Sequence, residues 1–329
     1  MKSQENNLII FPTWKSSLEK KSKEALEEKR YQDALDYLEK LSEYDVNSHE
    51  VLTGKLICLM ELGEQEKAEL LGEELLSLKN EHFYEYLHIY ATLLFQASKY
   101  DEAIDLLEVE IGLETVPEPL QTQLQQVCDI SKKLSDDRKE EQASVLLVKL
   151  KRAVQDQEPV TQWRLLEKLR SIYSTTESEL LTKMLVDKTI QPVVKTAIIL
   201  LYQAQNIDAS IELEKFGQSI TINPSELSEI SNHKAVEYIM SGLEEVEQEN
   251  PTLFELIKEL MYRYVYVRYP IMPTQKECGY ITEALKLLGY EYLQMQRNDS
   301  TMTQIDPEVT HYIEEIIASE KEYFSIIQD

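Results

Sequence analysis

Histidines are the first candidates for chemistry, because imidazole nitrogens bind metal ions and move protons near neutral pH. The chain has five histidines, and their densest local cluster is EHFYEYLH, residues 81–88. Here Glu85 stands three residues from both His82 and His88, so on a helix its carboxylate could approach either ring. The two histidines are six residues apart, however, and do not share a tight helical face. Without an HExxH pattern, we expect ordinary groove or surface histidines and no metal site.

The cysteines give no sign of nucleophilic or redox chemistry. Cys58, Cys128 and Cys278 are far apart, form no CxxC pair and lie in apolar, helix-like contexts, so Cys58 is expected in the core. This usage predicts a reducing, cytoplasmic setting. No GxSxG motif is present. A catalytic triad brought together only by the fold stays open as an alternative.

The glycine spacing excludes the common phosphate-binding loops. The chain has 8 glycines, and the nearest neighbours among them, Gly54, Gly63 and Gly72, are nine residues apart. Walker and dinucleotide loops need clustered glycines, so that backbone N–H groups can approach the phosphates. We therefore expect no nucleotide site and no cofactor.

The stretch MYRYVYVRYP, residues 261–270, holds residue types that can bind nucleic acid. Aromatic rings stack on bases and arginines hold phosphates, but Arg263 and Arg268 are its only basic residues. The preceding LFELIKEL continues a helical spacing into it through Ile257 and Tyr264. We expect an amphipathic helix that packs its aromatic side chains, with a peptide contact or a nucleic-acid contact as lesser alternatives.

The overall charge argues against nucleic-acid and membrane partners. A net charge of −26 and a pI near 4.6 describe a surface that repels phosphate backbones and anionic lipid headgroups. The sequence contains no run of 18 apolar residues, which is about the length that a helix needs to span a bilayer. The N-terminal apolar run, with Pro12 behind it, is too short for the core of a signal peptide.

Three segments of the chain repeat one pattern. They are RYQDALDYLEKL (30–41), GEQEKAELLGEEL (63–75) and KYDEAIDLLEVE (99–110), which align on Ala34, Ala68 and Ala103 at spacings of 34 and 35 residues. Leu18, Leu52 and Leu87 stand sixteen positions before these alanines, and polar turns are centred on Lys29, Gly63 and Ser98. Apolar residues at helical spacing on both sides of each turn predict three helical hairpins, with the small alanine where two helices cross closely.

This pattern resembles the tetratricopeptide repeat (TPR), a helical hairpin with a period of 34 residues. The resemblance covers residues 15–112. The sequence departs from the family pattern at two positions. Repeat two has Leu56 where repeats one and three keep the small residues Ser22 and Ala91, and leucine replaces the family's tryptophan in all three repeats. The resemblance implies a right-handed α-solenoid, because a single hairpin cannot bury its apolar face and stacked neighbours can.

The fold class expected for the whole chain is all-α, with one small β-hairpin. We expect three TPR hairpins over 1–115, a degenerate TPR- or HEAT-like helical segment over 116–206, and a β-hairpin with a helical domain over 207–329. A fourth hairpin is expected after Pro117. Alternating Ile211, Leu213, Ile220 and Ile222 around Gly217 predict the β-hairpin, about 211–222. The chain also resembles TPR proteins of Gram-positive bacteria that join such repeats to a helical C-terminal half.

In TPR domains the first helix of each hairpin lines a concave groove. Counted from the three alanines, the groove-facing candidates are Glu19 and Lys23 in repeat one, Glu50, Thr53 and Glu61 in repeat two, and Glu85, His88, Thr92 and Gln96 in repeat three. Each could equally belong to a solvated helix face. The carboxylate clamp of chaperone-binding members is absent, because HFYEYLHIYATLLFQA contains no lysine or arginine and Gly54 replaces an asparagine.

These features favour a non-catalytic adaptor or scaffold that binds a protein or peptide. An acidic groove lined with aromatic residues suits a basic or apolar, aromatic ligand. A peptide-sensing regulator is one alternative, although that class usually carries a DNA-binding or phosphatase head. An enzyme with its site in residues 207–329 is the other, and a pocket with converging carboxylates or histidines there would support it.

Overall fold

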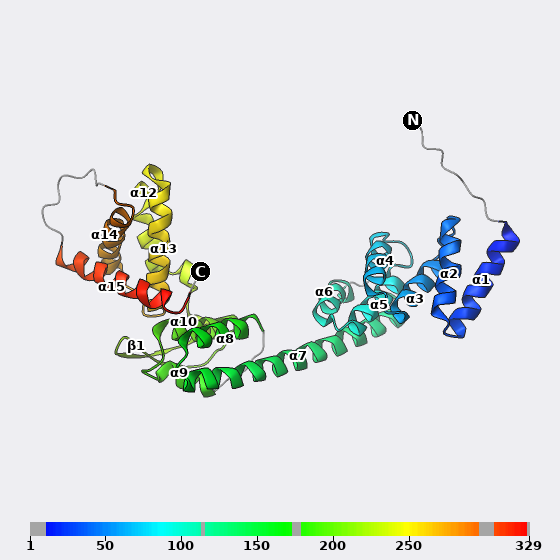
Figure 1. Cartoon of the computed structure of the whole chain (residues 1–329), viewed down its shortest axis with the longest axis horizontal. Coiled ribbons are helices and arrows are strands. Elements are labelled where there is room, and N and C mark those ends of the chain that lie inside the picture. The colour runs from blue at the N-terminus through cyan, green and yellow to red at the C-terminus, as the bar shows by residue number, and fades with distance from the viewer. Residues whose placement is uncertain (1–10, 113–115, 173–178, 296–305, 328–329) are drawn as a thin grey trace. The chain divides into compact units, whose positions relative to one another are not determined.

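A computed structural model describes residues 11–112, 116–172, 179–295 and 306–327 of the chain, and in this part every element is helical except one two-stranded hairpin (Figure 1). The chain divides into two compact units, residues 1–138 and 139–329. Most of the N-terminal apolar run lies outside the described residues. None of the described helices combines the length and the apolar character that crossing a bilayer requires.

Unit 1 contains the three predicted hairpins, which run from blue to cyan in Figure 1. They are α1 (Pro12–Glu27) with α2 (Tyr31–Glu43), α3 (His49–Glu61) with α4 (Gln65–Ser77), and α5 (Phe83–Gln96) with α6 (Tyr100–Ile111). Each helix packs against the next along the chain, and α3 also contacts both α1 and α5. The first helices of the hairpins are therefore neighbours, as the repeat predicts.

The turns inside the hairpins have one shared backbone conformation. Lys29, Gly63 and Ser98 all have left-handed φ angles, of 56°, 74° and 58°. Only glycine adopts this region without steric cost, so two of the three turns tolerate a small strain to keep the hairpin geometry. The common conformation explains why these positions recur at the period of the repeat.

Close helix crossings explain the small residues. The aligned alanines Ala34, Ala68 and Ala103 are each 0% exposed. Gly72 lies where α4 crosses α5, and a Cβ atom there would approach the Tyr90 ring to 2.3 Å. These positions hold the hairpins together through close packing, which larger side chains would disrupt.

The prediction of a fourth hairpin after Pro117 is wrong. Residues Glu118–Gln155 form one continuous helix, α7, which begins in unit 1 and ends in unit 2. No glycine or proline interrupts the sequence between Pro119 and the end of this helix. The polar stretch SDDRKEE, which resembles a turn by its composition, therefore simply forms part of the helix.

Unit 2 has one core that joins residues expected to lie in different domains. Its helices are α8 (Pro159–Ser171), α9 (Glu179–Val186), α10 (Pro192–Ala204), α11 (Lys234–Ser241), α12 (Glu244–Glu249), α13 (Pro251–Arg268), α14 (Gln275–Tyr292) and α15 (Pro307–Phe324), with short 3-10 turns η1 (Pro224–Glu226) and η2 (Ile230–Asn232). The apolar helix α10 packs against α8, α13 and α15. A single cluster of buried side chains contains both Ala143 and Ile327, so the expected boundary at 206/207 separates no cores.

The predicted β-hairpin is confirmed. Strands β1 (Ile211–Lys215) and β2 (Gln218–Ile222) pair antiparallel, with Ile211 opposite Ile222. The two-residue turn between them, Phe216 and Gly217, has positive φ at both positions, as a tight hairpin requires. Because Leu213 is buried in the core of unit 2, the hairpin is stabilised by packing on helices.

Candidate functional site

The nine candidate groove residues all lie on the first helices of the hairpins. Glu19 and Lys23 lie on α1, Glu50, Thr53 and Glu61 on α3, and Glu85, His88, Thr92 and Gln96 on α5. Lys23, Glu50, Glu61 and Gln96 are exposed, and the other five are half-buried. The set carries four carboxylates and one lysine, so the nine candidates together are net negative, whereas α1 as a whole has four lysines and three glutamates.

Two acidic members of the set have partners on or near their own hairpin. Glu19 pairs with Lys15 one turn earlier, at 3.7 Å between carboxylate and ammonium. Glu61 lies near Tyr31 of α2, whose pKa is raised, first by partial desolvation and then by this carboxylate.

The members on α5 are partly used in local structure. The Thr92 hydroxyl donates to the His88 carbonyl oxygen at 2.8 Å. Burial lowers the pKa of His88, which favours its neutral form at pH 7. Gln96 lines a cavity of about 200 Å³ together with Met60, Leu93 and the α3–α4 turn.

The expected aromatic lining of the groove is only partly present. Tyr86 and Tyr90 are 1% and 7% exposed, so they pack in the core of unit 1. Phe83 and Tyr84 are half-buried and pack against the cluster formed around Leu87. The residues that α5 leaves partly accessible are evenly divided between aromatic or aliphatic side chains and polar ones: Phe83, Tyr84, Ile89 and Phe95 against Glu85, His88, Thr92 and Gln96.

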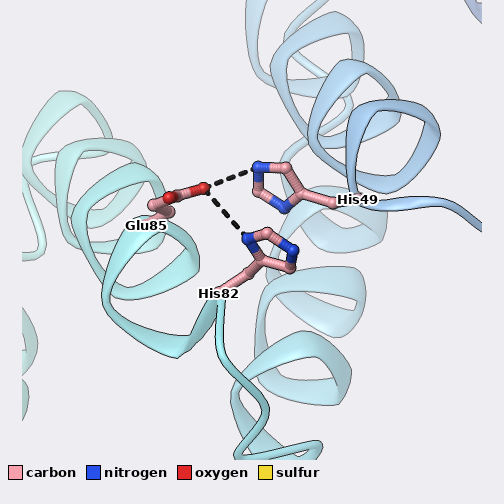
Figure 2. Close-up of side chains that lie close together, drawn as sticks. All are labelled: His49, His82 and Glu85. Carbon is pink, nitrogen blue, oxygen red and sulfur yellow. Dashed lines mark ion pairs between the residues drawn. The ribbon is translucent and has the colours of Figure 1, made fainter.

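One cluster brings together His49, His82 and Glu85, although His49 lies more than 30 residues from the other two in the sequence. His49 begins α3, His82 immediately precedes α5, and Glu85 lies in the first turn of α5 (Figure 2). His49 Nε2 lies 2.6 Å and His82 Nδ1 3.4 Å from the same carboxylate oxygen of Glu85, Oε2. The two imidazole rings stack with centroids 3.8 Å apart and an interplanar angle of 15°. These three side chains are of the types that bind a transition-metal ion.

The other ring nitrogens of the cluster also have polar neighbours. His49 Nδ1 lies 3.4 Å from the Thr53 hydroxyl, and His82 Nε2 lies 3.7 Å from the Glu81 carboxylate. The pKa of Glu50 is lowered, mainly by its own backbone N–H and by the Ser48 side chain, and further by the two histidines. A second carboxylate therefore lies close to the pair.

The local spacing could not reveal this cluster, because His49 comes from the preceding repeat. Within EHFYEYLH the structure pairs Glu85 with His82 and leaves His88 elsewhere. The period of the repeat was the one signal in the sequence that could have placed His49 near His82 and Glu85. Adding 34 or 35 residues to His49 gives position 83 or 84, between His82 and Glu85, so equivalent helix starts were bound to be neighbours.

Two cavities lie among the described residues of unit 2. One cavity, of about 560 Å³, is lined by residues of α10, η1, η2 and Tyr262, with Glu229 its one acidic residue. Another, of about 280 Å³, is lined by Lys188, Lys195 and Lys215 with Glu214. Neither of these two cavities brings carboxylates or histidines together.

The tyrosine–arginine stretch forms the end of α13 and is held within unit 2. Tyr264 is 1% exposed. Arg263 pairs with Glu320 at 3.1 Å, and Arg268 pairs with Glu315 at 3.2 Å. Because carboxylates of α15 pair with both guanidinium groups, the stretch packs against α15 as part of an amphipathic helix, as expected.

Comparison with known proteins finds a matching family and a similar curated protein. The family described as Protein of unknown function (DUF3196) matches residues 59–320, a span that includes parts of both units. The TPR repeat-containing protein YsoA of Bacillus subtilis (strain 168) is 30% identical over 289 residues, which is 86% of this chain and 86% of that protein. No solved structure matches the chain significantly.

Proposed function

This chain belongs to the family described as Protein of unknown function (DUF3196) and is a TPR repeat-containing protein, and from this premise we propose that it is a non-catalytic adaptor. In this proposal a segment of another protein lies along the first helices α1, α3 and α5. The observation that carries the proposal is that three stacked hairpins place acidic side chains on three neighbouring helices. A solenoid of this kind offers an extended surface that a peptide can follow.

The charges indicate what kind of segment fits. Glu50 and Glu85 occupy the same position in successive repeats, eighteen residues before Ala68 and Ala103. A basic segment would be attracted to such carboxylates and steered by the net charge of −26. The half-buried Ile57 and Ile89 offer apolar contacts beside them. We therefore favour a partner segment that alternates basic and apolar residues.

We also propose a cytoplasmic location. Its support is that Cys58, Cys128 and Cys278 are buried as free thiols. Proteins of oxidising compartments more often form disulfides from such residues.

The test is a cross-linked pull-down from native cytosol with wild type and the double variant Glu50→Lys/Glu85→Lys, in the presence of a chelator. The control is Glu39→Lys/Glu74→Lys, which makes the same change in net charge at exposed positions of α2 and α4. A captured segment is then synthesised and its dissociation constant measured. We expect the groove variant to weaken binding at least about tenfold, which is about 1.4 kcal/mol, and the control to retain it.

Two outcomes would count against the proposal. Equal loss in both variants would mean that only overall charge matters. Full binding by the groove variant would move the binding surface away from α3 and α5.

A further inference from the structure

We propose that His49, His82 and Glu85 form a binding site for one divalent transition-metal ion, with Zn²⁺ the ion that fits best. The proposal rests on the arrangement of these side chains and not on the groove function. One ligand atom from each residue can be chosen so that all three lie within 4.8 Å of one another. Figure 2 shows that both rings approach the Glu85 carboxylate from the ends of two neighbouring hairpins.

The distances are close to those of a metal site. Zn²⁺ binds histidine nitrogen and carboxylate oxygen at about 2.1 Å, so tetrahedral ligand atoms lie about 3.4 Å apart. The distance from His82 Nδ1 to Glu85 Oε2 is 3.4 Å. The distance from His49 Nε2 to the same oxygen is 2.6 Å, which is shorter than a shared ion allows, so the two atoms would have to move apart. The Glu85 side chain is 46% exposed and has room to move by that difference.

The stacked rings define the one rearrangement that binding requires. Imidazoles that lie face to face at 3.8 Å do not direct their lone pairs at a single point. One ring must therefore turn about its Cβ–Cγ bond, a torsion with a broad energy minimum. His82, which lies ahead of α5 and is 33% exposed, is the ring that can turn with the least disturbance of packing.

The surroundings supply what metal-binding histidines commonly have. A ligating histidine is usually oriented by a polar group on its other ring nitrogen. Here the Thr53 hydroxyl faces the second nitrogen of His49, and the Glu81 carboxylate faces that of His82. The acidic surroundings also raise the local concentration of cations.

The ligand types decide between classes of ion. Ca²⁺ and Mg²⁺ prefer six or more oxygen ligands, whereas imidazole nitrogen suits Zn²⁺ and its first-row neighbours. Three protein ligands leave the fourth tetrahedral position for water or for a donor atom of a bound molecule. An ion here would join the start of α3 to the start of α5 and so link the second hairpin to the third.

Isothermal titration of tag-free, metal-stripped full-length protein with Zn²⁺ tests the proposal, and Co²⁺ absorption reports the coordination geometry. The variants are His49→Gln and Glu85→Gln, and the control is His88→Gln, which removes a histidine of α5 outside the cluster. Circular dichroism establishes that each variant is folded. Glu85→Gln preserves size at a half-exposed position, so it remains informative if His49→Gln does not fold.

We expect one Zn²⁺ per wild-type chain, a tetrahedral Co²⁺ spectrum and no competition from excess Ca²⁺. Each cluster variant should weaken Zn²⁺ binding by more than about tenfold, since even loss of an outer partner commonly costs that much. The His88→Gln protein should bind like wild type. The proposal is overturned if wild type binds no stoichiometric Zn²⁺, or if Glu85→Gln binds as tightly as wild type.

Discussion

Lys215 is buried, although lysine side chains are usually exposed to solvent. It is 2% exposed at the end of β1, and its ammonium donates to the Thr196 hydroxyl at 2.7 Å and to the Tyr269 carbonyl at 2.6 Å. Burial lowers the pKa of Lys215 well below its usual value of 10.5, with Glu322 acting in the opposite direction. The lysine joins the hairpin to α10 and to the end of α13.

This burial predicts a pH dependence of stability. Between the lowered pKa of the folded state and 10.5, the unfolded chain binds more protons at Lys215 than the folded protein does, so this residue makes stability rise with pH. Relative to Lys215→Met, the free energy of unfolding of wild type should increase between pH 7 and pH 10, by at most about 1.4 kcal/mol per pH unit.

Urea denaturation at several pH values measures this difference. The control is Lys188→Met. Lys188 lines the same cavity of about 280 Å³ as Lys215, but its side chain is 80% exposed. The control should show no such trend relative to wild type. A flat difference between wild type and Lys215→Met would mean that Lys215 titrates as it does in the unfolded chain.

At the scale of elements, close crossings between helices decide which substitutions the fold tolerates. Gly289 and Gly279 both lie on α14. A Cβ atom at Gly289 would lie 2.7 Å from Ile257 Cγ1 on α13, whereas one at Gly279 would meet nothing within 4 Å. The two glycines therefore form a matched pair on one helix.

We predict opposite effects for alanine at these two positions. Gly289→Ala should destabilise the protein by about 1–3 kcal/mol through overpacking. Gly279→Ala should stabilise it by about 0.5–1 kcal/mol, because alanine loses less backbone entropy in a helix. Chemical denaturation monitored by circular dichroism gives both values. Equal effects of the two substitutions would refute the close crossing of α13 and α14.

The elements also show what the sequence could and could not predict. Phase agreement among Ala34, Ala68 and Ala103 was enough to predict three hairpins, and Gly217 with its alternating neighbours was enough to predict the β-hairpin. The continuous helix α7 was missed because two successive helical segments were predicted to form a hairpin, although no glycine or proline separates them. Helix ends depend on breakers and on tertiary contacts, and the latter cannot be deduced from periodicity.

The candidate site was also predictable only in part. Glu50 and Glu85 could be named from the repeat, since the repeat fixes which helical positions are neighbours. The pairing of His49 with His82 was missed, because it joins the ends of two helices, where loop length and side-chain rotation decide which atoms meet. The groove was predicted to have an aromatic lining without named residues, and the structure places Tyr86 and Tyr90 in the core, because helical spacing does not distinguish a groove face from the adjoining core face.

For the whole molecule, each unit has its own role in the proposal. Unit 1 supplies the stacked first helices and the acidic surface. Unit 2 has a continuous core from Ala143 to Ile327, in which even charged groups such as Arg263 are paired. The family match from residue 59 to residue 320 includes parts of both units, so both belong to what the family shares.

Site-specific photo-cross-linking tests the central claim most directly. A photoreactive amino acid is placed at Lys23 or Gln96, exposed positions on α1 and α5, and in parallel at Leu70 or Val109, which are 68% and 70% exposed on α4 and α6. If a segment lies along the first helices, the same partner should be cross-linked from Lys23 and Gln96 and not from Leu70 or Val109. Cross-links that form only from Leu70 and Val109 would contradict the account and assign binding to the second helices.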